Sequence, residues 1–374
     1  MGKSINGNKR CSGCGVCATV CPKHAISFSQ DNKGFSRPVV NENCIDCGIC
    51  VKKCHENKTT FLGDKIKAAY TAYSKNESIR NVSSSGGIFS EIALTVLADD
   101  GFVCGVAFDK DFHLCHQIID EVDKLDGLRQ SKYIESDITR IWEQIKERAL
   151  IKQQKGLFVG TPCQCSALRS YLGNQTNNLL ICDFICHGVA SPLVFKKFKE
   201  FLESRYGSPL KIEFRHKENG EGSYFYYEGT TGTYMIPNYK KSYPYAFATG
   251  LIIAEDCTDC NYCTLNRFGD ITLGDYVSGV TDYSKSTIFA NTQKGMDFIN
   301  RCQSIILKEE NLQDVTAKSW HLTTANTFNP QREEVFTNID KSWEYLEKKY
   351  FHLPSWSQRY KQALLNKFKK VNKL

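Results

Sequence analysis

The chain has 374 residues, which is enough for two domains or for one large core with a smaller module. Hydrophobic residues make up 41% of it and aromatic residues 12%, a composition that excludes a disordered protein. The formal net charge is +7, and the meaning of this excess depends on what the 18 cysteines bind.

The first ten residues contain no hydrophobic stretch, and no apolar run along the chain approaches the span of a bilayer. The sequence therefore predicts a cytoplasmic protein without a membrane span. In a reducing compartment, a large number of cysteines indicates metal ligation rather than a disulfide framework.

Two cysteine runs repeat near the start of the chain. Each has three cysteines at two-residue gaps and a fourth three residues later, the spacing of a ferredoxin with two [4Fe-4S] clusters. In that pattern the fourth cysteine of each run binds the cluster of the other run. The predicted ligands are Cys11, Cys14, Cys17 and Cys54 for one cluster, and Cys44, Cys47, Cys50 and Cys21 for the other.

Structural zinc is the alternative for these cysteines, but zinc sites use separated pairs rather than this doubled run. The second run departs from the ferredoxin pattern at His55, where proline usually follows the last cysteine. Residues 25–28 and 35–40 are expected to form a hairpin. Because each ligated cluster carries about −2, two or three clusters offset most of the net charge, and no nucleic-acid partner is expected.

A Ser/Gly segment at 83–87 opens a stretch whose apolar residues recur at helical spacing. Free backbone N–H groups, serine hydroxyls and the positive end of a helix dipole together suit a phosphate. The alternative is that the serines only cap the helix, which is the commoner role of such residues. The sequence leaves both interpretations open.

Apolar strands are expected near 68–73 and at 102–108, 157–160 and 179–186, with helices at about 166–172 and 192–203. Continuous apolar strands alternating with helices predict a sheet covered on both faces, with ligands at the carboxyl ends of its strands. The predicted fold class is α/β (α+β overall), with a bacterial-type ferredoxin-like module before a larger mixed-sheet domain. The aromatic segment Tyr224–Tyr227 is expected to be a strand packed on the core, with the wall of a substrate pocket as the alternative.

A third group of cysteines, Cys257, Cys260 and Cys263, precedes the segment Gly269–Asp275. One interpretation makes these three the ligands of another cluster with a remote fourth ligand. Structural zinc is the alternative, because a short run of this kind is weaker evidence than the N-terminal repeat.

Six motifs, taken in chain order, resemble the coenzyme F420 hydrogenase/dehydrogenase beta-subunit family. The resemblance covers roughly residues 65–320, and many members also carry a ferredoxin-like module in front. The motifs are Ser84-Ser-Gly-Gly87, Arg129-Gln-Ser-Lys132-Tyr, Gly160-Thr-Pro-Cys-Gln164, Cys186-His-Gly, Cys257-x-x-Cys260 and Gly269-Asp-Ile-Thr-Leu-Gly-Asp275.

The resemblance implies FAD beside the Ser/Gly segment, a third [4Fe-4S] cluster nearby and electron exchange with a second substrate. It assigns the third cluster to Cys163, Cys186, Cys257 and Cys260, and places Cys263 outside the shared pattern. This assignment is preferred to the local triplet. The cofactor-binding residues that it implies are Ser84, Ser85, Gly86, Gly87, Lys132, Thr161, Pro162, Gln164, Asp270 and Asp275.

Two of the residues in these motifs are candidates for catalysis. Lys132 is expected near the flavin, where a cation stabilises the reduced, anionic form, and a surface lysine is the alternative. His187 is a candidate proton donor, because an ordinary histidine pKa lies near the working pH; a histidine hydrogen-bonded beside a cluster is the alternative. Asp270 and Asp275 contact cofactor hydroxyls or cap a turn. The remaining thiols are expected to be buried apolar residues: Cys104, Cys115, Cys165, Cys182 and Cys302.

The main functional hypothesis is a flavin-dependent iron–sulfur oxidoreductase that passes electrons from the ferredoxin-like clusters to FAD and reduces an organic substrate. One alternative is oxidation of F420H2 or another hydride donor with export of electrons, and another is a non-catalytic electron-transfer subunit. The expected partners are ferredoxin or another redox protein and a small-molecule substrate, and self-association is compatible with the sequence. The expected domains are 1–62 (two-cluster module), 63–330 (FAD and cluster binding) and 331–374 (a C-terminal helical extension).

Overall fold

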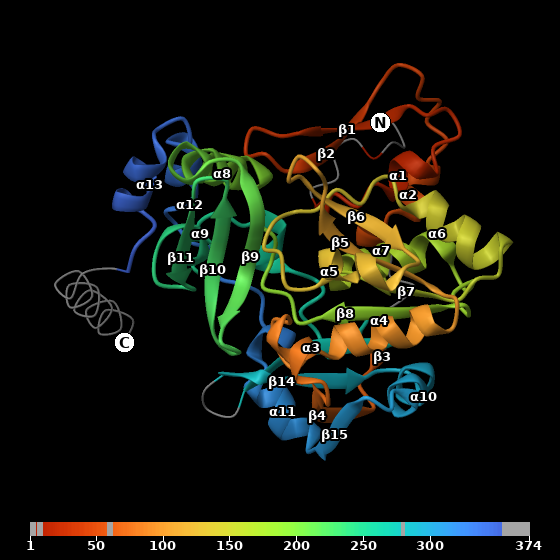
Figure 1. Ribbon diagram of the computed structural model, residues 1–374. Helices are drawn as coiled ribbons and strands as arrows, with labels where there is room; N and C mark the ends of the chain where they lie inside the picture. The colour runs from red at the N-terminus through yellow and green to blue at the C-terminus, as the bar shows by residue number, and fades with distance from the viewer. Residues whose placement is uncertain (1–4, 6–9, 58–62, 278–280, 354–374) are drawn as a thin grey trace, which may run out of the picture.

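The computed structural model describes residue 5 and residues 10–57, 63–277 and 281–353. Its largest sheet has eight strands: β4 (Ala68–Ser74), β5 (Phe102–Phe108), β6 (Leu114–Ile119), β7 (Gly156–Val159), β8 (Leu179–Phe184), β13 (Ile271–Val277), β14 (Thr281–Ala290) and β15 (Ile305–Glu310). Their order is β15-β4-β14-β13-β8-β7-β5-β6 (Figure 1). The central pairs β13–β8, β8–β7 and β7–β5 are parallel and the outer pairs are antiparallel, so the sheet is mixed, as predicted.

Helices cover both faces of this sheet. On one face lie α4 (Ile88–Ala98), α5 (Leu125–Leu128) and α10 (Gln293–Arg301), and on the other lie α6 (Trp142–Lys146) and α7 (Pro162–Leu172). Consecutive residues of β7 alternate between the two cores: Leu157 packs with the α4 side and Phe158 with the α6 and α7 side. Burial on both sides explains why these strands are continuously apolar.

A second layer contains three antiparallel strands, β9 (Pro209–Glu218), β10 (Glu221–Gly229) and β11 (Gly232–Pro237). Its core is aromatic, and Phe198 stacks on Tyr243 with ring centroids 5.4 Å apart. Phe225 and Tyr227 point into this core, which confirms the segment as a packed strand. The helices that complete the layer are α8 (Pro192–Tyr206), α9 (Ser242–Ala248), α12 (Arg332–Thr337) and α13 (Trp343–Lys349).

The N-terminal module contains α1 (Val16–Thr19), α2 (Ile49–Lys53) and the predicted hairpin of β1 (Ile26–Gln30) with β2 (Ser36–Val40). The turn of this hairpin packs on the second layer, where Lys33 pairs with Glu333 of α12 at 2.7 Å. Phe35 lies in the same core, with its ring 6.3 Å from that of Phe336. The module is therefore held against the body of the protein rather than joined to it only through the chain.

The remaining strands and α-helices are short: β3 (Asp64–Lys65), α3 (Glu77–Asn81), β12 (Asn266–Arg267) and α11 (Leu312–Lys318). In the part of the chain that the structure describes, no helix combines the length and the apolar character that a bilayer requires. Residues 331–353, which the sequence assigns to a C-terminal helical extension, contain α12 and α13, and these helices pack in the core of the second layer; the part of that segment beyond 353 lies outside the described residues.

Candidate cluster and cofactor sites

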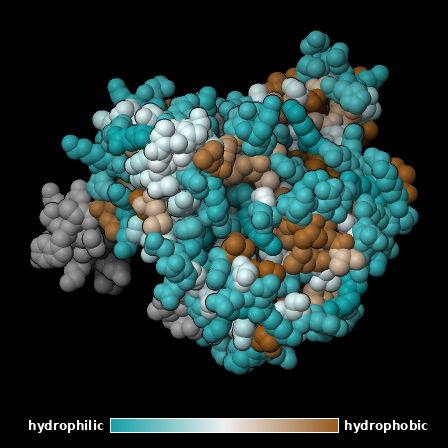
Figure 2. Space-filling model, in the orientation of Figure 1, coloured by the Kyte–Doolittle hydropathy of each residue, from teal (hydrophilic) through white to brown (hydrophobic). Residues whose placement is uncertain are grey.

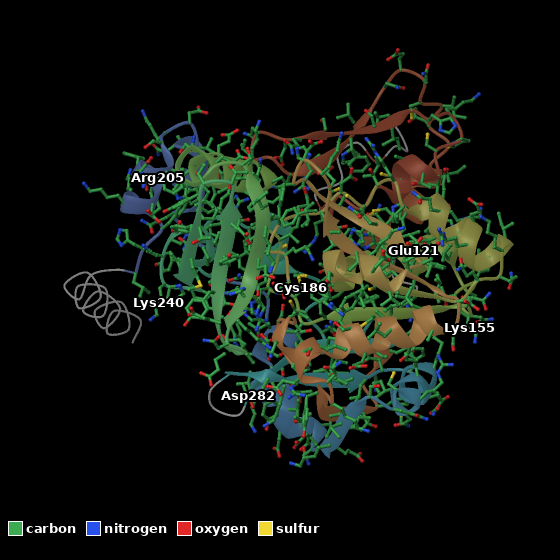
Figure 3. The ribbon with its side chains drawn as sticks, viewed as in Figure 1. Glu121, Lys155, Cys186, Arg205, Lys240 and Asp282 are labelled. Atoms are coloured by element: carbon green, nitrogen blue, oxygen red, sulfur yellow. The ribbon has the colours of Figure 1, made fainter. Side chains whose placement is uncertain are left out.

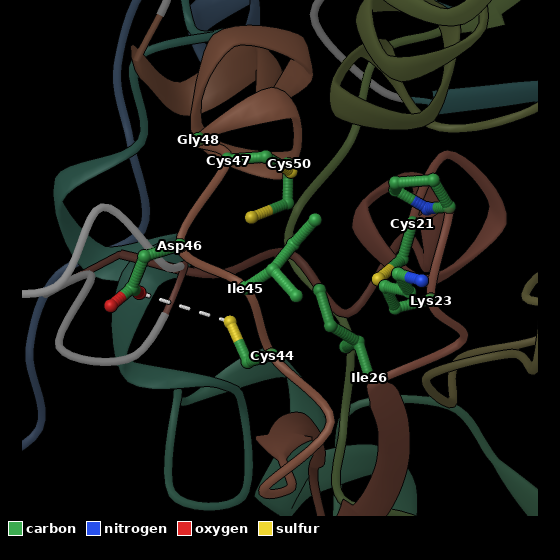
Figure 4. Close-up of a pocket in the computed structure, with 10 residues that line it drawn as sticks. Cys21, Lys23, Ile26, Cys44, Ile45, Asp46, Cys47, Gly48 and Cys50 are labelled. Carbon is green, nitrogen blue, oxygen red and sulfur yellow. Dashed lines mark hydrogen bonds between the residues drawn. The ribbon is translucent and has the colours of Figure 1, made fainter.

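One cysteine from the first run and three from the second line a single pocket of the N-terminal module (Figure 4). Cys21 follows α1, whereas Cys44, Cys47 and Cys50 come from the loop before α2 and from α2 itself. Ile26 of β1 covers the pocket with an apolar side chain. The structure thus brings together the crossed set that the spacing predicts for one cluster.

The other predicted set also assembles, because Cys54 at the end of α2 returns to the first run. Burial, and then repulsion from Cys11 and Cys54, raises the pKa of Cys17 to about 12. Cys14 lies within the same group and is repelled by the other three thiols. Thiols that resist ionisation when close together are suited to a positively charged metal core, because coordination deprotonates them. The donor set therefore fits an iron–sulfur cluster.

Gly15 allows the first cysteine loop to approach the large domain. It is the residue before α1 and has a φ of 79°, a left-handed conformation that favours glycine. A Cβ at this position would lie 2.7 Å from Cγ2 of Thr139. The cluster loop and the body of the protein are thus in direct contact.

A third group of thiols gathers at the carboxyl ends of β7 and β8. Cys163 lies in the first turn of α7, Cys186 follows β8 by two residues, Cys257 lies within a 3₁₀ turn, Glu255–Asp259, and Cys260 directly follows that turn. Each of the four interacts electrostatically with the other three. Burial, more than repulsion from Cys260, raises the pKa of Cys186 to about 12, although the Gly188 N–H donates to its sulfur at 3.3 Å.

Cys263 lies at the edge of this group. Its thiol forms a hydrogen bond with Cys260 and interacts electrostatically with Cys186. The two alternative ligand sets, the triplet with Cys263 and the set of four without it, therefore lie at the same site, which holds five thiols. The mutual electrostatic interactions of the four favour the assignment that the resemblance implied.

His55, the departure from the ferredoxin pattern, joins two cysteine groups. Its side chain is buried and bonds Ser12 of the first run at 2.8 Å through Nε2. Its Nδ1 bonds the hydroxyl of Tyr262. The backbone N–H of Tyr262 in turn donates to the sulfur of Cys260 at 3.4 Å. A proline could make neither bond, so His55 links the N-terminal module to the third thiol group.

The Ser/Gly segment is clasped by the Arg129–Lys132 motif. The backbone N–H of Ser131 donates to Oγ of Ser84 at 2.9 Å, and Nε of Arg129 donates to Oγ of Ser90 at 3.0 Å. Gln130 completes the clasp by donating to the carbonyl of Val82 at 3.3 Å. Two motifs whose bonded serines lie 47 residues apart in the sequence thus form one loop structure.

The serines of this segment do not cap α4. The residue before the helix is Gly87, with a φ of 85°, and no side chain caps the helix start. Ser83 instead donates to the carbonyl of Ile79, and Ser85 donates to the carboxylate of Asp275. The simple capping interpretation is therefore wrong, and the uncapped N-terminus of an eleven-residue helix is available to an anion.

Lys132 is held inside the clasp rather than on the surface. Its ammonium group donates to the carbonyl oxygens of Arg129 at 2.6 Å and of Gln130 at 3.4 Å. Burial lowers the pKa of Lys132 to about 7, only partly opposed by Glu213. Its charge therefore changes near neutral pH, and a permanent cation must come from another residue.

Thr161, Pro162 and Gln164 form the start of α7. The side chain of Gln164 accepts from the backbone N–H of Thr161 at 2.9 Å, while the hydroxyl of Thr161 accepts from the backbone N–H of Gln164 at 3.3 Å. This reciprocal capping box, with Pro162 as the first helical residue, begins the helix four residues earlier than expected. It also fixes Cys163, whose sulfur lies 3.0 Å from the Thr161 hydroxyl.

Asp270 has a structural role. Its buried carboxylate accepts from the backbone N–H of Ile181 at 2.9 Å and from the Thr292 hydroxyl at 3.0 Å, and it pairs with Lys294 at 2.9 Å. These contacts tie β8 to the segment before β13. Of the two alternatives for this residue, the structure favours the structural one.

Asp275 is different, because it lies between the Ser/Gly segment and β9. Arg215 of β9 donates to both of its carboxylate oxygens, at 2.8 and 2.9 Å, while Ser85 bonds the same group. Burial acts to raise the pKa of Asp275, but the charge and hydrogen bonds of Arg215, together with Ser85 and His187, outweigh it and hold the pKa below its usual range. The motif search missed Arg215; the available signal was two cations, Arg215 and Lys217, on one face of a strand.

His187 faces the same pair. It interacts electrostatically with Asp275 and Arg215, and its ring centroid lies 3.7 Å from that of His321. Burial lowers the pKa of His187 to about 4, so the expectation of an ordinary histidine pKa does not hold. Figure 3 places Cys186 between the two layers, and the surface is hollowed in the same region in Figure 2.

The thiols that were expected to be buried apolar residues largely are. Cys115 is half-buried, and the other four are 0–5% exposed: Cys104, Cys165, Cys182 and Cys302. A buried ion pair near the third thiol group was not foreseen. Arg267 and Asp183 are 3.0 Å apart, with side chains 1% and 0% exposed.

Comparisons with known proteins agree with this geometry. Residues 10–58 match the 4Fe-4S dicluster domain, and residues 153–315 match the family described as the C terminus of the coenzyme F420 hydrogenase/dehydrogenase beta subunit. A chain of the F420-reducing [NiFe] hydrogenase complex from Methanosarcina barkeri is similar in fold, with a TM-score of 0.50 and 18% identity over 71% of this chain and 91% of that chain.

No curated protein matches the sequence. The two family matches confirm the two-cluster prediction and the resemblance drawn from the motifs. Residues 153–315 thus match the C-terminal part of the coenzyme F420 hydrogenase/dehydrogenase beta subunit, and a match to the 4Fe-4S dicluster domain precedes them in the same chain.

Proposed function

We propose that the protein is a flavin-dependent iron–sulfur oxidoreductase that takes electrons at the dicluster domain and delivers them through a third [4Fe-4S] cluster to FAD, where an organic substrate is reduced. The observation that carries this proposal is the junction of two sites. Cys186 belongs to the third thiol group, and the next residue, His187, faces Asp275. Asp275 in turn bonds Ser85 of the Ser/Gly segment.

The route from the dicluster domain to the third thiol group is short because the two share one core. Cys14 of the first set packs in the same apolar cluster as Cys163 and Cys260 of the third group. Tyr262 lies in this cluster, and Trp142 donates from its indole nitrogen to the carbonyl of Cys14 at 2.7 Å. The packing supports direct electron exchange between these sites.

The surroundings of the Ser/Gly segment fit a flavin diphosphate. The uncapped start of α4 offers backbone N–H groups and the positive end of its dipole. Lys217 donates to the carbonyl oxygens of Arg80 and Ser85, both at 2.8 Å, and so holds the segment in place. Bound there, FAD supplies a carrier that exchanges electrons singly with clusters and in pairs with an organic substrate.

Four side chains at this site differ in the charge that they carry near neutral pH. Arg215 keeps its charge at all relevant pH values, whereas Lys132 is half-charged near pH 7. The negative charge of Asp275 compensates the positive charge of Arg215 in the protein without FAD. His187 is neutral at neutral pH and is able to donate a hydrogen bond through one ring nitrogen without carrying a charge.

Anaerobic cofactor analysis and a flavin-reduction assay test the proposal together. The holoprotein should contain about twelve irons, from four per cluster, and one flavin. Reduced ferredoxin should bleach that flavin, and Cys163→Ala should block the bleaching while the dicluster domain still accepts electrons. Cys302→Ala, at a buried thiol that belongs to none of the three thiol groups, is the matched control. Wild-type bleaching rates in Cys163→Ala would rule out the third cluster as the route.

The family description names coenzyme F420, and this favours a second direction of flow. In that case F420H2 reduces FAD and the dicluster domain exports electrons to a partner protein. Mixing the oxidised holoprotein with F420H2 under argon distinguishes the two. Bleaching by F420H2 and not by reduced ferredoxin would select the export direction.

A further inference from the structure

The third cluster site contains five thiols, one more than a [4Fe-4S] cluster uses. Four of them interact electrostatically with one another, and Cys263 joins the group through Cys260 and Cys186. A spare thiol in a loosely held surface loop would call for no explanation. The setting of Cys263 is different, because the chain on either side of it is fixed.

Arg267 fixes that chain. Its Nη1 donates to the carbonyl of Tyr262 at 3.3 Å and to the carbonyl of Thr264 at 3.2 Å, the two residues that flank Cys263. The guanidinium is itself anchored by Asp183 at 3.0 Å, in a pair that is almost fully buried. A buried ion pair of the domain core thus determines where the fifth thiol lies.

The local backbone presents Cys260 and Cys263 as a pair. The N–H of Cys263 donates to the carbonyl of Cys260 at 3.3 Å, which closes a tight turn between them. Their side chains are joined by a hydrogen bond, so the two sulfurs are neighbours. Cys260 also faces Glu56 and Arg10 of the dicluster domain, whereas Cys263 faces Arg267.

We propose that Cys263 is an alternate ligand of the third cluster and is able to take the place of Cys260 on one iron. This inference rests on the proposed function, which places a cluster at the site. In the exchange one iron–thiolate bond to Cys260 breaks and one to Cys263 forms, a proton passes from Cys263 to Cys260, and no electron is transferred. The exchange moves one ligand from the side of the dicluster domain to the side of the Arg267–Asp183 pair.

The site offers a matched set of variants for testing this. Cys260→Ala, Cys263→Ala, the double variant and Cys257→Ala are purified anaerobically as full-length holoprotein, and iron and sulfide are counted per chain. Cys257 is the control, because the interactions that join Cys263 to the group are with Cys260 and Cys186. Retention of the dicluster irons shows that each variant is folded.

The wild type, Cys260→Ala and Cys263→Ala should each keep about twelve irons, whereas Cys257→Ala and the double variant should lose about four. The electron paramagnetic resonance spectrum of the reduced third cluster should change in Cys260→Ala and not in Cys263→Ala. If the single variant Cys260→Ala also lost about four irons, as Cys257→Ala should, the ligand exchange would be overturned. The proposal of a third cluster would still stand. About eight irons in the wild type would instead overturn the third cluster itself.

Discussion

Arg215 donates to both carboxylate oxygens of Asp275 through a single nitrogen, Nη1. Its other two nitrogens, Nε and Nη2, are buried and have no hydrogen-bond partner in residues 10–57, 63–277 and 281–353. These two atoms form the side-on fork of the guanidinium, the edge that binds an oxoanion or a planar carbonyl through two parallel bonds. A buried donor without a partner is costly. A ligand that accepts hydrogen bonds from Nε and Nη2 therefore removes this cost, which contributes to its binding free energy.

This leads to a prediction for flavin binding. Arg215→Gln should weaken FAD affinity about 10–100-fold, because a hydrogen bond to a charged group contributes about 1.5–3 kcal/mol. Arg215→Lys keeps the charge without the fork, so its FAD affinity should lie between those of the wild type and Arg215→Gln. Equilibrium titration by flavin fluorescence measures this. Arg205→Gln, at an exposed pair with Glu344, is the control, and equal affinity in Arg215→Gln and the control would contradict the prediction.

Removing one partner of the buried Arg267–Asp183 pair should strongly destabilise the fold. Arg267→Met should lower the free energy of unfolding by about 3–5 kcal/mol, because it leaves the Asp183 carboxylate buried without its cation. Guanidinium unfolding of the anaerobic protein, followed by circular dichroism, measures the change. Arg301→Met removes an exposed pair with Asp99 and should cost less than about 1 kcal/mol. An equal loss of unfolding free energy in both variants would contradict this prediction.

The crossed arrangement of the dicluster domain can be tested by iron analysis. A Cys44/Cys47/Cys50→Ala triple variant should keep the cluster of the first run. Adding Cys54→Ala to it should remove about four more irons, because Cys54 lies with Cys11, Cys14 and Cys17.

Cys21→Ala is the matched control for that experiment. Added to the same triple variant, it should remove no further iron, because Cys21 lines the pocket of the other cluster. The reverse result, with Cys21 required and Cys54 dispensable, would establish uncrossed ligation.

His116 should make stability depend on pH. Burial lowers the pKa of His116 to about 4, and its ring stacks on Phe158 with centroids 6.0 Å apart. Between about pH 6.5 and 4 the unfolded chain binds the proton more tightly than the folded one, so stability falls as the pH falls through this range. The loss should reach at most about 3 kcal/mol near pH 4.

Chemical unfolding at several pH values measures this effect. His116→Gln should reduce the slope of the profile between about pH 6.5 and 4, with the remaining slope due to other buried histidines such as His187, whereas His113→Gln, at a side chain 77% exposed, should leave it unchanged. A profile of unaltered slope in His116→Gln would assign the acid sensitivity to other groups.

Much of the scaffold was predictable because its signals are local. The run Phe102–Phe108 forms β5 with those bounds, and the paired cysteine runs define the dicluster domain. The start of α7 was placed four residues late, since the capping box of Thr161 and Gln164 was assigned to cofactor binding instead of to the helix. A capping signal and a ligand signal use the same residue types, and only the hydrogen bonds separate them.

The site was predictable only in part, because its electrostatics depend on distant pairs. Asp275 was found through its motif, but Arg215 lies sixty residues away and belongs to another sheet. His55 was noted only as a missing proline, although it bonds Tyr262 across 207 residues of sequence. No pattern along the chain reports such contacts, and the pKa of His187 follows from burial that the sequence does not reveal.

The contact between Lys33 and Glu333 has a consequence for biosynthesis. The two residues are 300 positions apart, so at about 5–20 residues per second the hairpin of the dicluster domain waits about 15–60 s for its docking surface to leave the ribosome. During that interval Cys11, Cys14 and Cys17 have been synthesised, but the α12 surface that anchors the hairpin has not. The order of translation thus gives cluster assembly factors a period of access before the module docks.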